Sequence, residues 1–362
     1  MTVTYAMLVL LVSLVLLPLA AAGDAASKPA TTAPASTRAA GVEKIILDTD
    51  LGDDVDDAGA MAVLHALADR GEIEILAVGI VNGHPDAVPC ADAINTYFGR
   101  PDLPLGTIAA KDAPIRHDTF KLGQIAAAYP HRLTQATAPD VIDLYRRVLA
   151  AQPDRSVNIV VIGQATNIMN LLKSKGDKHS PLDGVDLMRR KIKFYAAGGN
   201  GRATLPGGQA GWNYMNDKQA AWYELENLPS EFPTVFAGGS GLKIEIGSCY
   251  RDAPADHIVR KCYENYFKGT AKDRPIWDQM RLLYAARPSF RDHFKRSADG
   301  CVTINRDTGH ITWLAEPNRN HSYAYVEKDR REAVKAELAT LMMHVPKKTP
   351  ASMPASSPRG EP

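Results

Sequence analysis

The sequence is poor in cysteine, in net charge and in internal repeats, and each shortage narrows the classes of protein to consider. The 362 residues carry a formal net charge of +1 without a basic stripe, which gives no electrostatic footprint for nucleic acid. Four cysteines, Cys90, Cys249, Cys262 and Cys301, form no CxxC pair, so we do not expect a thiolate metal site. Their spacing does not choose among three disulfide pairings or none. The 45% hydrophobic and 23% charged content is typical of a globular protein with a large core.

The N-terminus carries the most apolar run of the sequence, Ala6 to Ala22. It is short for a membrane span and ends in Ala20-Ala21-Ala22, which suits a signal-peptidase site, although no Lys or Arg precedes it. We therefore predict a signal peptide over residues 1–22 and a secreted or periplasmic protein with no membrane attachment after cleavage. An uncleaved anchor is the alternative. No cysteine lies near the cleavage site, so a lipoprotein is not expected.

Two segments lack the large apolar residues that a folded core requires. Residues 23–41 are rich in Ala, Ser, Thr and Pro, and residues 346–362 have a similar composition. Such segments cannot bury enough surface to become ordered. The sequence thus predicts a disordered linker, one folded domain over residues 42–345 and a disordered tail.

Within the domain, short apolar runs alternate with stretches of helical spacing. The predicted strands are Lys44–Leu47, Ile73–Val81, Asn158–Ile162, Lys191–Ala196 and Thr234–Ala237. The predicted helices between them are Asp57–Asp69, Pro85–Phe98, Pro139–Ala151, Asn167–Lys173 and Asp217–Leu225. This alternation predicts an α/β fold, a mostly parallel open sheet with helices on both faces and a Rossmann-like core.

The remainder of the domain has a weaker pattern. Residues 105–138 indicate an irregular excursion, and the region over residues 257–287 is expected to be helical. Two short strands, Cys301–Ile304 and His310–Leu314, and a last helix at Lys328–Met343 complete the prediction.

The stretch KIILDTDLGDDVDDA, residues 44–58, places six aspartates directly after a predicted buried strand. In open parallel sheets, ligands bind beyond the carboxyl ends of the strands. A helix N-terminus accommodates one or two carboxylates but does not need six. Like charges this close raise one another's pKa unless a cation neutralises them. The choice is therefore between a solvated acidic loop and a site for a hard cation such as calcium or magnesium.

Two metal-binding motifs with similar residues fit poorly. An EF-hand loop starting at Asp48 requires an acidic fifth residue, a glycine sixth and a glutamate twelfth, where this chain has Gly52, Asp53 and Gly59. A phosphatase with a D-x-D nucleophile is expected to have Thr or Val in place of Gly52 and a phosphate loop that we do not find.

The segment KIILDTDLGDDVDDAGAMAVL resembles the opening of the inosine–uridine-preferring nucleoside hydrolases, whose signature is D-x-D-x-G followed by D-D-A. Here two extra residues stand before Asp56-Asp57-Ala58. The resemblance continues through four further segments in the same order: ILAVGIVNG, IVVIGQATNIMNLL, GWNYMNDKQAA and RPIWDQMRLLYAARP. Five elements in order are far more specific than a lone D-x-D-x-G.

The resemblance implies Ca²⁺-dependent hydrolysis of the N-glycosidic bond of ribonucleosides. It implies that the ion is bound by Asp50, Asp57, Asp278 and the backbone carbonyl of Ile162. Asp50 would also act as general base toward the attacking water.

The resemblance also implies the contacts of the sugar. Asp56 would hydrogen-bond the ribose diol, and Asn82 and Asn213 would orient the sugar. Asp48 would support the loop from behind. The implied partner is a small nucleoside, a homo-oligomer is left open, and nucleic acid is not expected.

Two positions depart from the family pattern. Some members have a His before the late metal-binding Asp, where this chain has Trp277, which can stack on a base but cannot protonate it. We therefore expect a preference for purines. Many members have a Glu two residues before the sugar-binding Asn, where this chain has Gly211. Its loss leaves open a non-catalytic nucleoside- or carbohydrate-binding protein, and a metal-dependent phosphatase is the other alternative. Asp53 and Asp54 have no assigned role.

Overall fold

The computed structural model describes residues 41–198, 208, 210–238 and 243–346. A compact unit begins at Val42. The predicted signal peptide, most of the predicted linker and most of the predicted tail lie outside the described residues. Among the described residues, no helix is long and apolar enough to cross a membrane.

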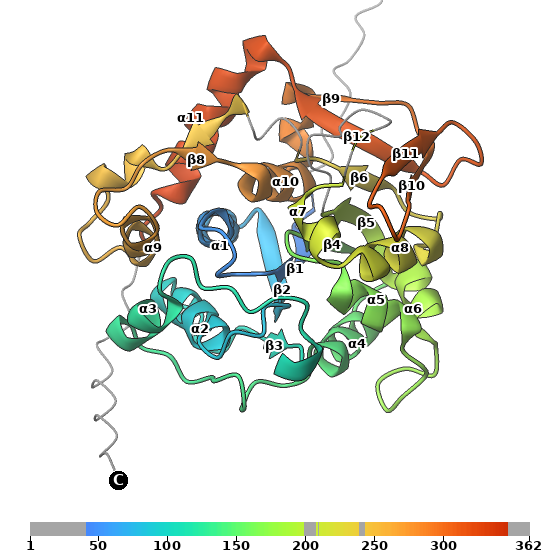
Figure 1. The fold of residues 1–362 in the computed structure, drawn as a ribbon, viewed down its shortest axis with the longest axis horizontal. Helices are drawn as coiled ribbons and strands as arrows, with labels where there is room; N and C mark the ends of the chain where they lie inside the picture. The colour runs from blue at the N-terminus through green and yellow to red at the C-terminus, as the bar shows by residue number, and fades with distance from the viewer. Residues whose placement is uncertain (1–40, 199–207, 209, 239–242, 347–362) are drawn as a thin grey trace, which may run out of the picture. The chain divides into compact units, whose positions relative to one another are not determined.

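An eight-stranded sheet forms the centre of this unit (Figure 1). The strands are β1 (Glu43–Thr49), β2 (Ile73–Ile80), β3 (Leu105–Thr107), β4 (Val157–Val161), β5 (Ile192–Ala197), β6 (Thr234–Phe236), β9 (Phe294–Arg296) and β12 (His321–Val326). Their order is β3-β2-β1-β4-β5-β6-β12-β9, and every neighbouring pair is parallel except β12 and β9. The predicted mostly parallel α/β sheet is confirmed.

Helices cover both faces of the sheet through two hydrophobic clusters. One face is covered by α1 (Asp56–Asp69), α2 (Ala87–Tyr97), α3 (Leu122–Ala128), α9 (Ile258–Tyr266), α10 (Trp277–Ala286) and α11 (Arg331–Met342). The other is covered by α4 (Val141–Ala151), α5 (Thr166–Lys173), α6 (Gly184–Lys191), α7 (Trp212–Asn216) and α8 (Lys218–Asn227). Two small hairpins pair β10 (Cys301–Ile304) with β11 (Ile311–Leu314), and β7 (Glu245–Ile246) with β8 (Arg274–Pro275). Short 3-10 turns are η1 (Ala110–Asp112), η3 (Ser248–Asp252), η4 (Pro288–His293) and η5 (Lys328–Arg330).

Helix α1 follows the acidic loop directly and is buried along most of its length. Its sequence DDAGAMAVLHALAD is apolar on nearly all sides, and every residue from Asp56 to Leu67 is buried. A helix that is apolar all round has to be enclosed, and α1 lies between the sheet, α10 and α11. Its N-terminus is therefore held rigidly at the end of β1.

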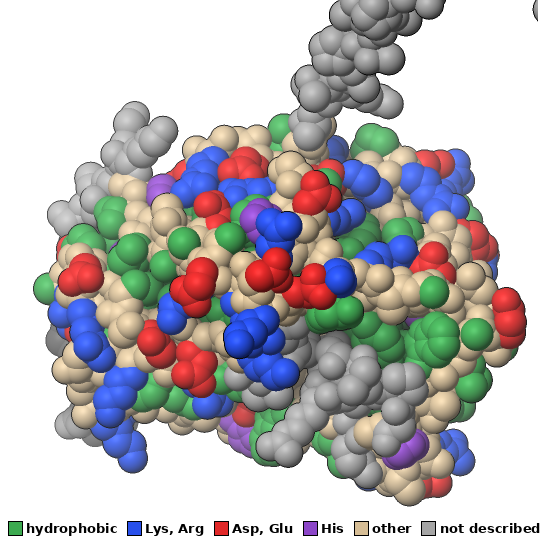
Figure 2. Space-filling model, turned by 90° about the horizontal axis from the view of Figure 1, so that it is seen from above, with side chains coloured by type: hydrophobic (Ala, Val, Ile, Leu, Met, Phe, Trp, Pro, Cys, Tyr) green, Lys and Arg blue, Asp and Glu red, His purple; other side chains and the backbone are tan. Residues whose placement is uncertain are grey.

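The surface carries charges of both signs. Figure 2 shows acidic and basic side chains interspersed over one face of the molecule. Many form exposed ion pairs, such as Lys295 with Glu327, which contribute about 0–1 kcal/mol each. The stability of the fold therefore depends mainly on its two apolar clusters.

The strand order reverses at β1, because β2 lies on one side of this strand and β4 on the other. Such a switch point opens a crevice beyond the carboxyl ends of the two central strands. Gly163 follows β4 here, and a Cβ at this residue would lie 2.7 Å from the backbone N of Asp50. The absence of a side chain at Gly163 thus lets the chain after β4 approach the acidic loop closely.

The region over residues 257–287, which the sequence predicts to be helical, contains two helices and not a single one. The structure has α9 and α10 separated by β8. Lys268 and Gly269 both have positive φ, and Pro275 lacks the amide hydrogen that a helix interior needs. The predicted strand Cys301–Ile304 and the last helix are confirmed.

Several elements were not predicted from the sequence. They include β3, η1 and α3 within the predicted irregular excursion, the helices α6 and α7, and the strands β7, β8, β9 and β12. Most are short, so hydrophobic periodicity gives them little signal.

We expect the substitution Gly163→Ala to destabilise the protein by about 1–3 kcal/mol, because the added methyl group meets backbone atoms that cannot move aside. Urea denaturation followed by circular dichroism measures the change in the free energy of unfolding. Gly41→Ala is the matched control, since nothing lies within 4 Å of a Cβ at that residue. Equal stability of the two variants would contradict the close approach.

Candidate active site

Buried carboxylates gather at the carboxyl end of β1, where the chain turns into α1. Asp48, Asp50, Asp56 and Asp57 are all buried there, and Asp278 joins them from the first turn of α10. Gly52 allows the turn: its φ is 112°, and a Cβ would lie 2.6 Å from Leu122. The local sequence and a distant helix therefore build one acidic site.

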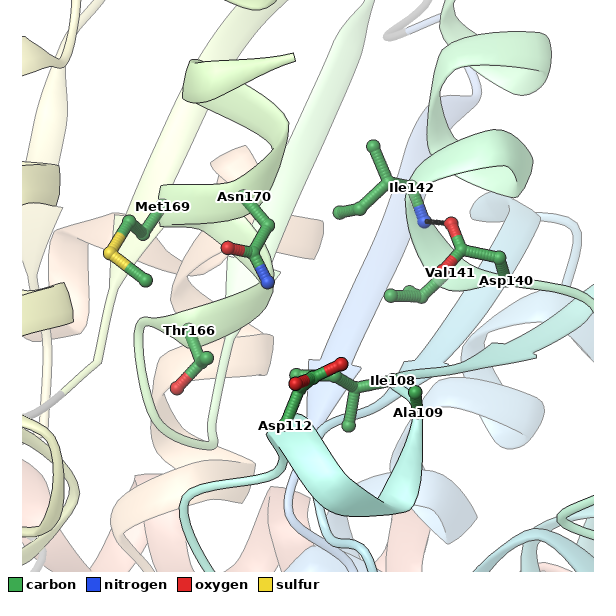
Figure 3. A pocket seen from close by; sticks show the side chains of 9 residues that line it. All are labelled: Ile108, Ala109, Asp112, Asp140, Val141, Ile142, Thr166, Met169 and Asn170. Carbon is green, nitrogen blue, oxygen red and sulfur yellow. Dashed lines mark hydrogen bonds between the residues drawn. The ribbon is translucent and has the colours of Figure 1, made fainter.

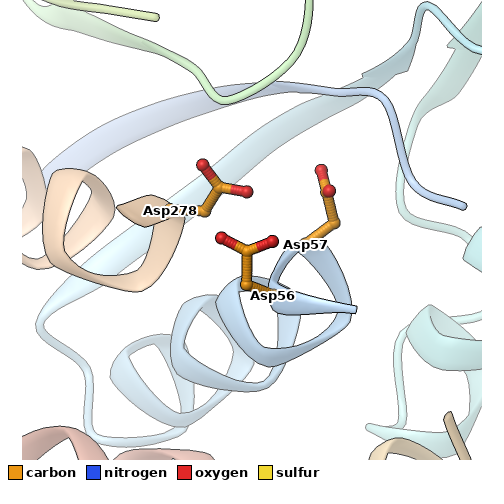
Figure 4. Close-up of side chains that lie close together, drawn as sticks. All are labelled: Asp56, Asp57 and Asp278. Carbon is orange, nitrogen blue, oxygen red and sulfur yellow. The ribbon is translucent and has the colours of Figure 1, made fainter. Parts of the chain in front are cut away.

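Three of these carboxylates lie especially close together (Figure 4). Asp56, Asp57 and Asp278 each offer an oxygen, and the three oxygens lie within 4.8 Å of one another. Two come from the N-terminus of α1 and the third from the N-terminus of α10, and these two helices pack together. Hard oxygen ligands at this spacing fit a cation such as calcium or magnesium.

Asp50 lies beside this triad. Gln164, just after β4, donates a hydrogen bond from Nε2 to Oδ2 of Asp50 at 2.6 Å. The charges of Asp53 and Asp278 act on the Asp50 carboxyl. The closest group in the structure therefore contains Asp56 with Asp57 and Asp278, and Asp50 lies beside this group.

Burial is the main cause of the raised pKa values of these carboxyl groups. It raises the pKa of Asp50, Asp56 and Asp57 well above the usual range, and the neighbouring carboxylates raise it further. Burial also raises the pKa of Asp278 to about 6, although Arg281 opposes the shift. Ionising all four groups without a counter-charge is unfavourable. A divalent cation would remove this repulsion, so the donor set fits such an ion.

Asp48 anchors the start of the acidic loop through hydrogen bonds to other elements. Its Oδ2 accepts hydrogen bonds from Oη of Tyr145 at 2.6 Å and from Nδ2 of Asn167 at 2.9 Å. Burial raises the pKa of Asp48 to about 7. Thr49 donates from Oγ1 to Oδ1 of Asp57. These contacts fix the orientation of β1's last residues and of the first carboxylates of α1.

Asn82, after β2, uses its buried side chain to hold two loops together. Its Nδ2 donates to the carbonyl oxygens of Leu51 and His117, and its Oδ1 accepts from the amide of His84. In this arrangement Asn82 positions the acidic loop.

Asn213, in α7, reaches the carboxyl end of β4. Its Nδ2 donates to the carbonyl oxygen of Ile162 at 2.5 Å, the same oxygen that the resemblance implies as a metal ligand. Asn213 and Ile162 are therefore brought together as neighbours, although they lie 51 residues apart.

The two extra aspartates of the acidic loop, Asp53 and Asp54, contact side chains from different segments of the chain. Asp53 accepts hydrogen bonds from Nε1 of Trp212 and contacts the ring of His117 through Nδ1. Asp54 forms an ion pair with Arg274. Sequence analysis missed these roles because the partners lie 64 to 220 residues away. Trp212 had one signal, its place directly before Asn213 in the segment GWNYMN.

Two indole rings belong to this region. The guanidinium of Arg274 lies 5.2 Å from the ring centre of Trp277, so Asp54 holds Arg274 and Arg274 covers Trp277. Trp212 is 63% exposed. Both tryptophans are thus linked to the acidic loop through its two extra residues.

A separate cavity of about 380 Å³ lies between η1 and the first turns of α4 and α5 (Figure 3). Its lining includes Asp112, Asp140 and Thr166. Asp140 caps α4 by accepting from the amides of Ile142 and Asp143. None of the clustered carboxylates lines this cavity, so we assign the chemistry to the acidic site.

Comparison with known structures finds the same fold repeatedly. A purine-preferring ribonucleoside hydrolase from Gardnerella vaginalis has a TM-score of 0.61 at 16% identity, covering 83% of this chain and 98% of its own. An inosine-guanosine nucleoside hydrolase has a TM-score of 0.58 at 17% identity, covering 83% and 98%. The type III effector XopQ, complexed with adenosine diphosphate ribose, has a TM-score of 0.59 at 15% identity, covering 83% and 92%. A search of curated proteins gave no match.

The sequence model of the inosine-uridine preferring nucleoside hydrolases matches residues 45–337. The match begins in β1, ends in α11 and includes every clustered carboxylate. With the acidic site at the switch point of the sheet, it shows that the chain belongs to the inosine-uridine preferring nucleoside hydrolase family of N-glycosyl hydrolases.

Proposed function

We propose that this protein hydrolyses the N-glycosidic bond of ribonucleosides in a Ca²⁺-dependent reaction, and that it prefers purine nucleosides. The observation that carries the proposal is the group of Asp56, Asp57 and Asp278, with Asp50 beside it, at the carboxyl end of β1. Family membership supports a small nucleoside as substrate. Free base and ribose are the products.

The proposed ligands of the ion are the side chains of Asp50, Asp57 and Asp278 and the carbonyl oxygen of Ile162. Bound there, a calcium ion would hold the attacking water and lower its pKa. Asn213 already contacts the carbonyl oxygen of Ile162, so it would lie beside the sugar hydroxyls that complete the coordination. Asp56 would accept hydrogen bonds from the ribose diol, and Asn82 would keep the acidic loop in position.

Asp50 is the proposed general base. Gln164 fixes one oxygen of its carboxylate by donating a hydrogen bond, which orients the group toward the attacking water. As the bond between C1′ and the base nitrogen breaks, its electron pair leaves with the base and positive charge develops on the ribosyl ring. The surrounding carboxylates stabilise that charge where it forms. The water oxygen adds to C1′ and gives one proton to Asp50. The departed base takes up a proton from solvent and Asp50 releases its proton to solvent, which completes the hydrolysis.

Purine preference is proposed from the aromatic side chains beside the carboxylates. Trp277 directly precedes Asp278 and is held by Arg274, while Trp212 is tied to Asp53. Stacking of a base on an aromatic side chain contributes about 1–3 kcal/mol, and the larger purine ring gains more from it. No histidine stands at position 277 to protonate the leaving base.

Gly211 favours a second candidate function, the binding of a riboside without cleavage. This residue caps the N-terminus of α7, and it offers no carboxylate to the sugar. Without that group the developing ribosyl cation is less stabilised, whereas binding through the remaining aspartates is retained. The release of free base distinguishes the two functions.

Incubation with a panel of nucleosides and Ca²⁺, followed by chromatography of the free base, tests the hydrolase. We expect base release from the wild type and a loss of kcat/KM of about 10²–10⁴-fold in Asp50→Ala, because the general base is removed. Asp102→Ala is the matched control, since this carboxylate is 85% exposed. Removal of Ca²⁺ by a chelator is expected to abolish the reaction. Tight riboside binding without release of base from any nucleoside would support the second candidate instead.

We expect Trp277→Ala to lower kcat/KM for inosine by about 5- to 150-fold and to affect uridine less, because the purine loses more stacking. Steady-state kinetics with both nucleosides measure the ratio. Trp222→Ala serves as the control, because Trp222 lies in α8 against Arg306. Equal kcat/KM for inosine and uridine in the wild-type protein would refute the purine preference.

We further propose that the protein is exported and functions as a secreted or periplasmic enzyme. The proposal is supported by the apolar run from Ala6 to Ala22 and by the small residues at its end. Mass spectrometry of the protein from its native host is expected to show a mature chain that starts at about residue 23. An intact chain in the membrane fraction would instead indicate an uncleaved anchor.

A further inference from the structure

Arg281 places a permanent positive charge beside the carboxylate cluster. Its side chain is only 4% exposed, and an arginine side chain carries a positive charge in proteins. A buried charge of this kind requires a partner of opposite sign. Its Nη1 donates to Oδ1 of Asp278 at 3.1 Å and to the carbonyl oxygen of Val161, also at 3.1 Å.

These two contacts join two of the segments that bear proposed metal ligands. Asp278 and Arg281 stand three residues apart on α10, so they share one face of the helix. Val161 is the last residue of β4 and directly precedes Ile162. The guanidinium therefore bridges the helix that carries Asp278 and the strand end that carries the carbonyl ligand.

The ion pair of Arg281 with Asp278 stands out because the cluster contains several carboxylates and few positive charges. Asp50, Asp56, Asp57 and Asp278 are buried together, and among the described residues no other Lys or Arg forms an ion pair with any of them. Arg274, the nearest comparable residue on the acidic loop, pairs with Asp54 instead. Among the described residues, Arg281 is thus the one basic side chain that forms an ion pair with a carboxylate of the cluster.

We propose that Arg281 is an internal counter-cation, which stabilises the carboxylate cluster in the metal-free protein and lowers the affinity of the same cluster for Ca²⁺. The inference deepens the proposed function, because it concerns the proposed metal site. Arg281 acts through Asp278 and is a positioning residue, not a catalytic one. The enzyme would then bind calcium reversibly and respond to its concentration.

The physical reason is that two positive charges share one set of carboxylates. Without metal, the guanidinium offsets part of the repulsion among them. With metal, the guanidinium repels the ion across a buried, poorly screened distance, and it occupies Oδ1 of Asp278. A residue that only supported packing would stabilise the metal-free and calcium-bound proteins equally.

Two substitutions separate the charge of Arg281 from its hydrogen bonds. Arg281→Gln keeps an amide donor and removes the charge, whereas Arg281→Lys keeps the charge. Arg189→Gln, in an exposed ion pair on α6, is the control. Calorimetric titration of the full-length, metal-free proteins with CaCl₂, all at the same pH of about 8, measures the dissociation constants. Thermal denaturation with and without CaCl₂ measures stability.

We expect Arg281→Gln to bind Ca²⁺ about 10- to 50-fold more tightly than the wild type. Its metal-free form is expected to melt at a lower temperature, and added CaCl₂ is expected to raise the melting temperature more than in the wild type. Arg281→Lys is expected to bind within about threefold of the wild type. Binding by the Gln variant alone, without measurable binding by the wild type, would also support the proposal.

Several outcomes would overturn it. These are unchanged or weaker Ca²⁺ binding by a folded Arg281→Gln variant, an equal loss of melting temperature with and without CaCl₂, or absence of binding by every variant. Only the last outcome would also remove the proposed metal site. If Arg281→Gln folds only when CaCl₂ is present, the proposal is supported. If it does not fold at all, tenfold tighter binding by Arg281→Lys would exclude the charge as the cause.

Discussion

The repulsion among carboxylates buried together at the end of β1 is the constraint on which the rest of the site depends. Desolvation and mutual repulsion raise the pKa of Asp50, Asp56 and Asp57, so the folded chain holds these groups at a cost. The core supplies the rigidity that keeps them in place. Helix α1 is enclosed along nearly its whole length, and β1 lies between two parallel neighbours. Loosening either element would let the carboxylates move apart.

The polar contacts around the cluster divide into those that orient carboxylates and those that tie side chains of other elements to the acidic loop. Tyr145, Asn167 and Gln164 orient Asp48 and Asp50 through hydrogen bonds to single oxygens. Asp53 and Asp54 instead hold aromatic and basic side chains that come from other elements. The two extra residues of the acidic loop therefore tie side chains of α7 and β8 to the loop that carries the carboxylates.

The fold and the acidic loop could be predicted because their signals are local. Continuous apolar strands alternating with helices indicate a parallel sheet, and the rule on strand ends places Asp50 and Gln164 together. Asp278 came only through resemblance to a family, since it lies more than 220 residues from Asp57. The ion pair of Asp54 with Arg274 and the contacts of Arg281 could not be predicted, because they arise from helix packing. The strands β3 and β9 have three residues each, so their pairing depends on neighbours already in place.

The chain of contacts from Asp54 to Arg274 to Trp277 has a consequence for ligand binding. Asp54 stands two residues before Asp56, and Trp277 directly precedes Asp278, so these contacts connect the loop before Asp56 with the start of the helix that carries Asp278. A base stacked on Trp277 and a cation bound by the carboxylates would thus both affect the positions of the same few residues. Thermodynamic linkage makes such an influence mutual: if the cation strengthens the binding of the base, the base strengthens the binding of the cation to the same degree. Substrate itself would then help the enzyme to retain its metal.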